Sequence, residues 1–202
     1  MITPPRYKTA RRLGASIYEK TQTPKYSLRT QRKSSRKEFN RPKTEYGMKI
    51  LEKQRIKYSY GISEKQFSNY VQKINKSHSA NRSEMLYRML ESRIDNVIFR
   101  SGLAPSRQSS RQMVSHGHIM VNGKRVNIPS YAVTLKDSLS IKPSSSTKLI
   151  FSNIEEKLKD FSTPTWLNFD TKKLLINMRE HPKSDQTEVY NTLGSILDFY
   201  KK

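Results

Sequence analysis

The clearest chemistry in this sequence comes from five side chains that carry, or can carry, a positive charge within one short stretch. They are Arg107, Arg111, His116, Lys124 and Arg125. The planar guanidinium of arginine donates two parallel hydrogen bonds, which match the geometry of phosphate oxygens. Arg107 and Arg111 are four residues apart and would therefore share one face of a helix. The stretch predicts a surface that binds a polyanion.

Other kinds of chemistry have less support. His116 and His118 have the spacing of two metal ligands, but no cysteine or carboxylate cluster completes a site, so we expect no metal. Asp95 lacks a second carboxylate for acid–base catalysis, and its place two residues after Arg93 favours a structural ion pair or cap. The sequence has no cysteine, no Walker-type phosphate loop and no nucleophile elbow. We therefore expect neither an enzyme nor a cofactor.

Two helices are predicted to position the arginines. Asn81 and Glu84 have the spacing of a capping box, so the first helix is expected to begin there. Apolar residues then recur at three-and-four spacing as far as Ile98, which predicts one apolar face. The second helix is expected from Ser106, whose hydroxyl would cap its first turn, to about Ser115.

A hairpin is predicted directly after the second helix. Apolar and polar residues alternate on both sides of Asn122-Gly123, in residues 119–121 and 126–128. Asn-Gly between alternating segments is typical of a two-residue turn in which both central residues have positive φ. Further alternation predicts two more short antiparallel strands, at residues 133–135 and 139–141.

The charge of the chain indicates a nucleic-acid partner. The formal net charge is +22, from 39 Lys and Arg against 17 Asp and Glu, and only 34% of the residues are hydrophobic. A nucleic acid would neutralise this charge and release counterions. Residues 1–60 hold 17 basic and 4 acidic residues, and residues 61–150 hold 14 and 5, whereas residues 151–202 hold 8 of each. The cationic surface is thus expected in the N-terminal and central parts, and no apolar run suggests a membrane partner.

Residues 93–131 resemble the S4-type RNA-binding module. The resemblance rests on three motifs in order: R-x-D-N, then S-R-x-x-x-R-Q-x-V-x-H-G-H-I, then V-N-G-K-x-V-x-I-P-S-Y. In that family, the second helix and the turn into the first strand form one basic surface that docks on structured RNA. The resemblance implies RNA contacts at Arg93, Arg107, Arg111, Gln112, Ser115, His116, Lys124 and Arg125.

Segments outside this module are similar to a narrower family, the bacterial-type fourth small-subunit ribosomal protein. The similar segments are R-R-L-G at residues 11–14, E-K-Q-R-I-K-Y-x-Y-G-I-x-E-K-Q-F at 52–67, P-x-W-L at 164–167 and the closing L-D-F-Y-K-K. The block at 52–67 is the most informative, because S4-type modules also occur in several enzymes. The resemblance adds Arg11, Arg12, Lys53 and Arg55 to the RNA-binding residues. It also implies that Arg36, Lys37, Arg41 and Lys43 face the mRNA entry channel.

The resemblance implies an α+β fold, in which a discontinuous helical domain holds an inserted S4-type RNA-binding module with a small antiparallel sheet. Residues 1–46 would form a basic extended N-terminal arm, and residues 47–92 the helical domain. Residues 93–179 would form the module and its extension, and about 180–202 would complete the helical domain. A short helix is also expected at 154–161, with Trp166 in the core.

The resemblance also implies a function, that of a structural constituent of the small ribosomal subunit. The protein would bind the 5′ domain of small-subunit rRNA as an early assembly protein. It would lie near the mRNA entry site beside the third and fifth small-subunit proteins, and contact with the fifth would influence translational accuracy. Its ribosome would be in a bacterial cytoplasm, a plastid or a mitochondrion.

Two alternatives remain open at this point. One is an RNA-modifying enzyme of the pseudouridine-synthase kind, which would need a separate catalytic domain with an acidic nucleophile. The other is an extra-ribosomal RNA-binding stress factor or translational repressor that carries the same module.

Overall fold

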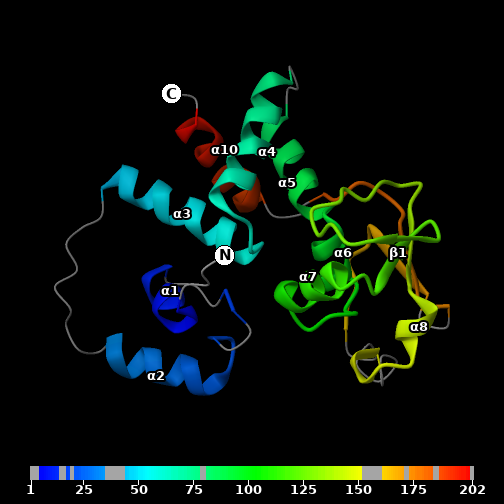
Figure 1. Ribbon diagram of the computed structural model, residues 1–202. Coiled ribbons are helices and arrows are strands. Elements are labelled where there is room, and N and C mark those ends of the chain that lie inside the picture. The colour runs from blue at the N-terminus through cyan, green and yellow to red at the C-terminus, as the bar shows by residue number, and fades with distance from the viewer. Residues whose placement is uncertain are drawn as a thin grey trace. The chain divides into compact units, whose positions relative to one another are not determined.

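The computed structural model describes residues 5–13, 17–18, 21–34, 44–77, 81–151, 161–170, 173–183 and 187–200. Within these residues the fold consists of helices and a five-stranded antiparallel sheet, so the predicted α+β class is confirmed (Figure 1). The chain divides into two compact units. The first comprises Met1–Gln72 and Asn191–Lys202, and the second comprises Lys73–Tyr190. No helix among the described residues is long and apolar enough to cross a membrane.

The first unit begins with two short helices, α1 (Arg6–Leu13) and α2 (Pro24–Ser34). An extended arm was expected here, so the structure differs from that expectation in the described part of residues 1–46. The rings of Tyr7 and Tyr26 stack with their centroids 5.8 Å apart, and Leu13 is buried. These few apolar contacts favour helices in a segment whose overall composition is polar and basic.

Two further helices follow, α3 (Glu45–Ser59) and α4 (Glu64–Lys76). The chain turns between them at Gly61, which has a φ of +62°. A reciprocal capping box begins α4, since the Gln66 amide N–H donates to Ser63 Oγ at 3.2 Å and the Ser63 N–H donates to Gln66 Oε1 at 3.4 Å. The apolar spacing in this segment predicts a stripe of Phe67, Tyr70, Val71 and Ile74, of which Phe67, Val71 and Ile74 are buried and Tyr70 is half-buried.

The last helix, α10 (Thr187–Phe199), packs against α3. Ser195 Oγ donates to Glu52 Oε2 at 3.3 Å, although 143 residues separate the two in sequence. The rings of Tyr46 and Phe199 lie with their centroids 5.4 Å apart. The first unit is therefore built from both ends of the chain.

Glu64 connects the C-terminal end of the chain to the first turn of α4. Its carboxylate accepts hydrogen bonds from Lys53 Nζ at 2.8 Å, Lys57 Nζ at 3.0 Å and the Tyr200 hydroxyl at 2.6 Å. Lys53 Nζ also lies 5.0 Å from the ring centroid of Phe199, within reach of a cation–π interaction. Partial burial acts to raise the pKa of Glu64, but the hydrogen bonds from Lys53, Tyr200 and Lys57 outweigh it and lower this pKa to about 2.

In the second unit, the helix predicted from residue 81 is broken in two. The pieces are α5 (Arg82–Glu91) and α6 (Ile94–Arg100). Arg93 lies between them in an extended conformation and forms a β-bridge with Ala132. The Ile94 N–H donates to the Tyr131 carbonyl at 2.9 Å. The bridging segment lies some forty residues along the chain, which explains why the local apolar spacing did not reveal the break.

The start of α5 also differs from the prediction. Asn81 makes no side-chain cap, and its Nδ2 donates instead to Glu84 Oε2 at 3.3 Å. Glu84 also accepts from Arg88 Nη2 at 2.9 Å. The expected capping box is therefore wrong, because the Glu84 side chain is engaged by two other side chains.

The predicted helix and hairpin that follow are both present, although the second strand of the hairpin begins directly after the turn, at residues 124–126, and not at the predicted 126–128. The helix is α7 (Arg107–Ser115), and the N–H of Ser109 donates to its N-cap residue, Ser106, at 3.2 Å. The hairpin consists of β1 (Ile119–Val121) and β2 (Lys124–Val126), which pair in antiparallel register.

The sheet has the strand order β2-β1-β3-β5-β4. The strand predicted at 139–141 is β3 (Ser138–Ile141), but the one at 133–135 is absent, because Val133 instead donates its N–H to Ser92. Two strands beyond β3 were not predicted from the sequence, namely β4 (Leu167–Asp170) and β5 (Leu175–Met178).

The core of the second unit lies between α6, α7 and the sheet. Trp166 is buried in it, as predicted. Two short helical turns follow β3, namely α8 (Pro143–Ser146) and η2 (Leu149–Phe151). Except for Phe161, the helix predicted at residues 154–161 lies outside the described residues. Core residues from the helices and strands include Ile94, Val97, Ile98, Val114, Ile119, Val121, Leu139, Ile141, Ile176 and Met178.

Replacement of Glu64 by Gln is expected to destabilise the protein in a pH-dependent way. The pKa of Glu64 is lower in the folded than in the unfolded state, so its contribution is complete above about pH 5 and is lost as the pH falls toward about 2. In urea unfolding, Glu64→Gln should be less stable than the wild type at pH 7, and the difference should narrow at about pH 3.

Glu45→Gln provides the matched control, because Glu45 forms an exposed i, i+4 pair with Lys49 on α3. We expect this variant to change stability little at either pH. Equal stability of Glu64→Gln and the wild type at pH 7 would contradict the role given to Glu64.

Candidate nucleic-acid interface

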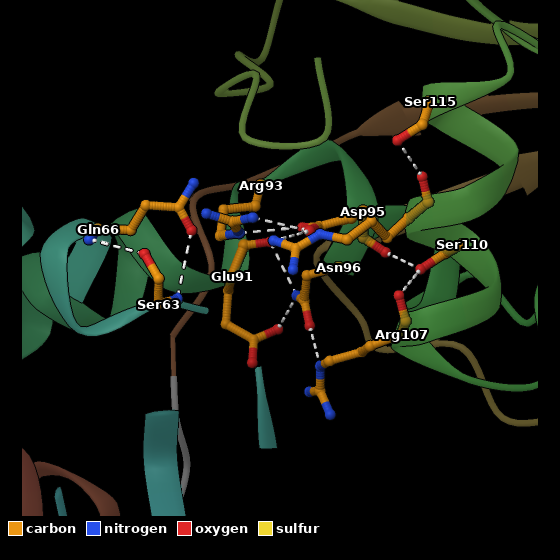
Figure 2. A network of polar contacts seen from close by, with 10 residues as sticks. Ser63, Gln66, Glu91, Arg93, Asp95, Asn96, Arg107, Ser110 and Ser115 are labelled. Atoms are coloured by element: carbon orange, nitrogen blue, oxygen red, sulfur yellow. Dashed lines mark hydrogen bonds and ion pairs between the residues drawn. The ribbon is translucent and has the colours of Figure 1, made fainter. Parts of the chain in front are cut away.

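The two arginines of α7 are held by side chains of α6, and Figure 2 shows the contact between Arg107 and Asn96. Arg107 Nε donates to Asn96 Oδ1 at 2.7 Å, and its guanidinium carbon lies 4.5 Å from the ring centroid of Phe99. Arg111 Nη2 lies 3.3 Å from Asp95 Oδ2, and the Arg111 side chain is 28% exposed. The structure thus brings Arg107 and Arg111 together, as the sequence predicted. Each of them contacts a buried residue of α6, Arg107 at Asn96 and Arg111 at Asp95.

Arg93 occupies a different position from the other predicted RNA contacts. It is 1% exposed, and it donates to Asp95 through Nε at 3.0 Å and through Nη2 at 2.7 Å. The ion pair favoured for Asp95 from the sequence is therefore confirmed. A buried guanidinium must be paired in this way, and it does not reach a partner at the surface.

Arg100 is a cation that was not predicted to belong to this region. It forms a bidentate pair with the fully buried Glu91, through Nε at 3.0 Å and Nη2 at 2.9 Å. Its side chain remains 36% exposed. The two residues are nine apart and lie on either side of the break between α5 and α6, so helical spacing gave no signal of their contact.

Arg125 of the hairpin lies against the end of α7. Its Nη2 is 3.3 Å from the carbonyl oxygen of His116. Gly117 has a φ of +70°, and a Cβ at this position would overlap the Arg125 guanidinium. Gly117 thus permits both the positive φ and the close approach of Arg125. A cation next to the last carbonyls of a helix is also favoured by the helix dipole.

The hairpin turn that precedes Lys124 is fixed by side chains. Asn122 and Gly123 have φ values of +50° and +77°, as expected for the predicted turn. Asn122 Nδ2 donates to Asp137 Oδ1 at 2.7 Å, and Asn122 Oδ1 accepts from the Ser138 N–H at 2.9 Å. Burial acts to raise the pKa of Asp137, but hydrogen bonds from the Thr134 N–H and hydroxyl, from Asn122 and from Tyr131 lower it overall. Lys124 therefore projects from a turn that is tied to the start of β3.

The remaining predicted residues of this module are exposed. Gln112, Ser115 and His116 lie on or just after α7, and Lys124 lies in β2. Ser115 Oγ donates back to the Arg111 carbonyl at 2.9 Å. Together with Arg107, Arg111 and Arg125, these residues form what we call the α7–hairpin surface.

His118 is not part of that surface, because it is buried. Its Nδ1 lies 3.0 Å from Ser145 Oγ. Burial lowers the pKa of His118, and the nearby positive charges, led by Lys148, lower it further. No group of three or more potential metal ligands occurs within the described part of the chain.

In the first unit, the predicted RNA contacts differ in accessibility. Arg11 and Arg12 are exposed on α1. Arg55 is exposed too, but its Nε donates to the Leu13 carbonyl at 2.6 Å. The side chain of Lys53 is only 14% exposed and is paired with Glu64. The proposed mRNA-entry residues Arg36, Lys37, Arg41 and Lys43 lie outside the described residues.

Comparison with known proteins identifies two matching families. Residues 2–91 match the family model for the ribosomal protein S4/S9 N-terminal domain, and residues 92–139 match that for the S4 domain. The small ribosomal subunit protein uS4 of Aquifex aeolicus is 38% identical over 204 residues, which cover 98% of this chain and 97% of that protein. The uS4 protein of Petrotoga mobilis is 35% identical over 206 residues, with the same coverage. That of Borreliella burgdorferi is 37% identical over 201 residues, which cover 96% of this chain and 95% of that protein.

The fold and the two matched domains define a ribosomal protein that carries an S4 domain. Identities above 30% extend over nearly the whole length of both chains in these comparisons. The chain belongs to the family of small ribosomal subunit protein uS4. This family consists of ribosomal proteins rather than enzymes, so the RNA-modifying enzyme considered from the sequence is ruled out.

Replacement of Gly117 by Ala is expected to displace Arg125 and to cost stability. The positive φ should cost about 1–2 kcal/mol in the free energy of unfolding, and the new methyl group would occupy the place of the guanidinium. The measurements are urea unfolding and a crystal structure of the variant.

Gly123→Ala is the matched control, because Gly123 has a φ of +77° and no atom lies within 4 Å of the place that a Cβ would take. We expect a similar loss of stability, about 1–2 kcal/mol, with Arg125 left in place. An unmoved Arg125 in Gly117→Ala would disprove the proposed role of Gly117.

Proposed function

We propose that the protein binds small-subunit rRNA through the α7–hairpin surface, as a structural constituent of the small ribosomal subunit. The observation that carries the proposal is that Arg107, Arg111 and Arg125 are fixed around one helix, with Lys124 and His116 beside them. Guanidinium groups held in place suit phosphate oxygens, because less side-chain freedom is lost on binding. Because the chain belongs to the uS4 family, we expect the polyanion that binds this surface to be small-subunit rRNA.

The expected mode of recognition is shape and phosphate contact. Side chains cannot enter the deep, narrow major groove of an RNA helix, so proteins contact the backbone and the irregular junctions of folded RNA. The exposed Arg11 and Arg12 of α1 would add phosphate contacts from the first unit. Lys53 is a poorer candidate than the sequence suggested, since Glu64 already neutralises it.

We further propose that the RNA target is the 5′ domain and that binding occurs early in assembly. The protein would lie near the mRNA entry site beside the third and fifth small-subunit proteins, and its contact with the fifth would influence accuracy. The ribosome would be of the bacterial type, in a bacterial cytoplasm, a plastid or a mitochondrion. Cross-linking within reconstituted small subunits tests the proposed neighbours.

The primary test measures binding to the protein-free, folded 5′ domain of small-subunit rRNA against an unrelated folded RNA of equal length. At about 0.15 M salt, we expect the 5′ domain to bind at least about tenfold more tightly, which corresponds to roughly 1.4 kcal/mol. Arg107→Ala and Arg111→Ala should each weaken binding by about tenfold and lower the slope of log K against log salt by about one.

Lys173→Ala is the control for loss of charge. Lys173 is exposed in the connection between β4 and β5, at the opposite edge of the sheet from β2. We expect the Lys173→Ala variant to bind the 5′ domain with the affinity of the wild type. Equal binding to both RNAs, or an equal loss of affinity in Lys173→Ala, would show that the protein binds RNA by nonspecific attraction of its net charge and would contradict the proposed surface.

A further inference from the structure

Two neighbouring buried residues of α6 each contact one of the two arginines on α7. Asp95 pairs with Arg111, and Asn96 accepts a hydrogen bond from Arg107. The two arginines are one helical turn apart, so adjacent residues on one helix support consecutive turns of the other. A hydrogen bond from Ser110 Oγ to the Asp95 carbonyl, at 2.5 Å, joins the two helices between these contacts.

The orientation of the Asn96 amide is set from its far side. Asn96 is 1% exposed, and its Nδ2 donates to the Glu91 carbonyl at 3.0 Å and to Glu91 Oε2 at 2.7 Å. With the amide nitrogen directed at Glu91, Oδ1 points at α7 and accepts from Arg107 Nε (Figure 2). Only a side chain with a donor and an acceptor at this position can make both contacts. Aspartate would lack the donor, and leucine would lack both groups.

Each arginine is therefore held by side chains of α6. Nε of Arg107 is held by Asn96, while its plane lies over Phe99. Asp95 is shared between the buried Arg93 and the partly exposed Arg111, which fixes the Arg111 side chain without enclosing it. An arginine whose rotamer is already selected loses less conformational entropy when it binds phosphate.

We propose that Asp95 and Asn96 are positioning residues for RNA recognition, which hold Arg111 and Arg107 in the conformation that meets the RNA phosphates. This inference rests on the proposed binding of rRNA by the α7–hairpin surface. According to this inference, two buried residues that do not themselves touch RNA raise the affinity for RNA through the arginines that they hold. A purely structural role would stabilise α5, α6 and α7 but would leave the effect of each arginine on affinity independent of its α6 partner.

The test is a double-mutant cycle on affinity for the folded 5′ domain, with Asn96→Ala, Arg107→Ala and the double variant. We expect Asn96→Ala to weaken binding about fivefold and Arg107→Ala about tenfold. The double variant should bind about as well as Arg107→Ala alone, because Asn96 acts through Arg107. Losses that multiply in the double variant would overturn the inference.

Ser101→Ala is the matched control for loss of a buried hydrogen bond at α6. Ser101 is fully buried, and its hydroxyl donates to the Ile98 carbonyl at 2.9 Å. This variant should lose stability in urea unfolding but keep the affinity of the wild type. A loss of affinity in Ser101→Ala as large as that in Asn96→Ala would show that general stability governs binding, and would also overturn the inference.

Arg107→Lys keeps the inference testable if Asn96→Ala does not fold. Lysine preserves the charge but has no Nε–H for Asn96 and no planar fork. We expect affinity to fall about fivefold while the salt dependence stays that of the wild type. Wild-type affinity in Arg107→Lys would show that position 107 needs only a charge.

Failure of the inference differs from failure of the proposed function. If Arg107→Ala itself binds like the wild type, the α7–hairpin surface is wrong. If Arg107→Ala loses affinity but Asn96→Ala does not, the surface stands and the positioning role is wrong.

Discussion

The second unit depends on one buried ion pair, that of Arg93 with Asp95. Removing two charges from water is costly, so such a pair persists only with good geometry and further hydrogen bonds. The bidentate contact supplies the geometry, and the hydrogen bond from Ser110 to the Asp95 carbonyl links the same residue to α7. Arg93 also bridges to Ala132. The break between two helices, the loop after the hairpin and the helix that carries the partly exposed Arg107 and Arg111 all meet at this pair.

The first unit uses charge differently. The carboxylate of Glu64 is partly exposed and gathers two lysines and a tyrosine hydroxyl from separate segments. A contact to a partly exposed carboxylate is weakened by solvent and salt, but the three contacts together fix where the C-terminal end lies. Because Lys53 is paired with Glu64 in this cluster, it is less available to bind RNA. In a chain with a net charge of +22, a carboxylate can thus determine which cations remain for a partner.

Several local features were predictable from the sequence, although the capping box expected at Asn81 and Glu84 was wrong, and most of the long-range contacts were not predictable. The cap at Ser106, the α7 arginines and the Asn122-Gly123 turn depend on residues within a few positions of one another, and all were predicted. The break at Arg93, the pairing of Arg100 with Glu91 and the strands β4 and β5 depend on partners elsewhere in the chain. The helices α1 and α2 were missed because a few contacts, such as that between Tyr7 and Tyr26, outweigh a polar composition. Arg93 shows the same limit, since its sequence motif matched but its burial could be seen only in three dimensions.

The position of β2 at the edge of the sheet has a consequence for the protein before it meets any partner. An edge strand exposes unpaired backbone N–H and C=O groups, which can recruit another strand and start aggregation. This strand has only three residues, Lys124–Val126, and two of them are cations. A second copy approaching edge to edge would bring like charges together. We therefore expect Lys124 and Arg125 to disfavour edge-to-edge pairing between two copies of the free protein.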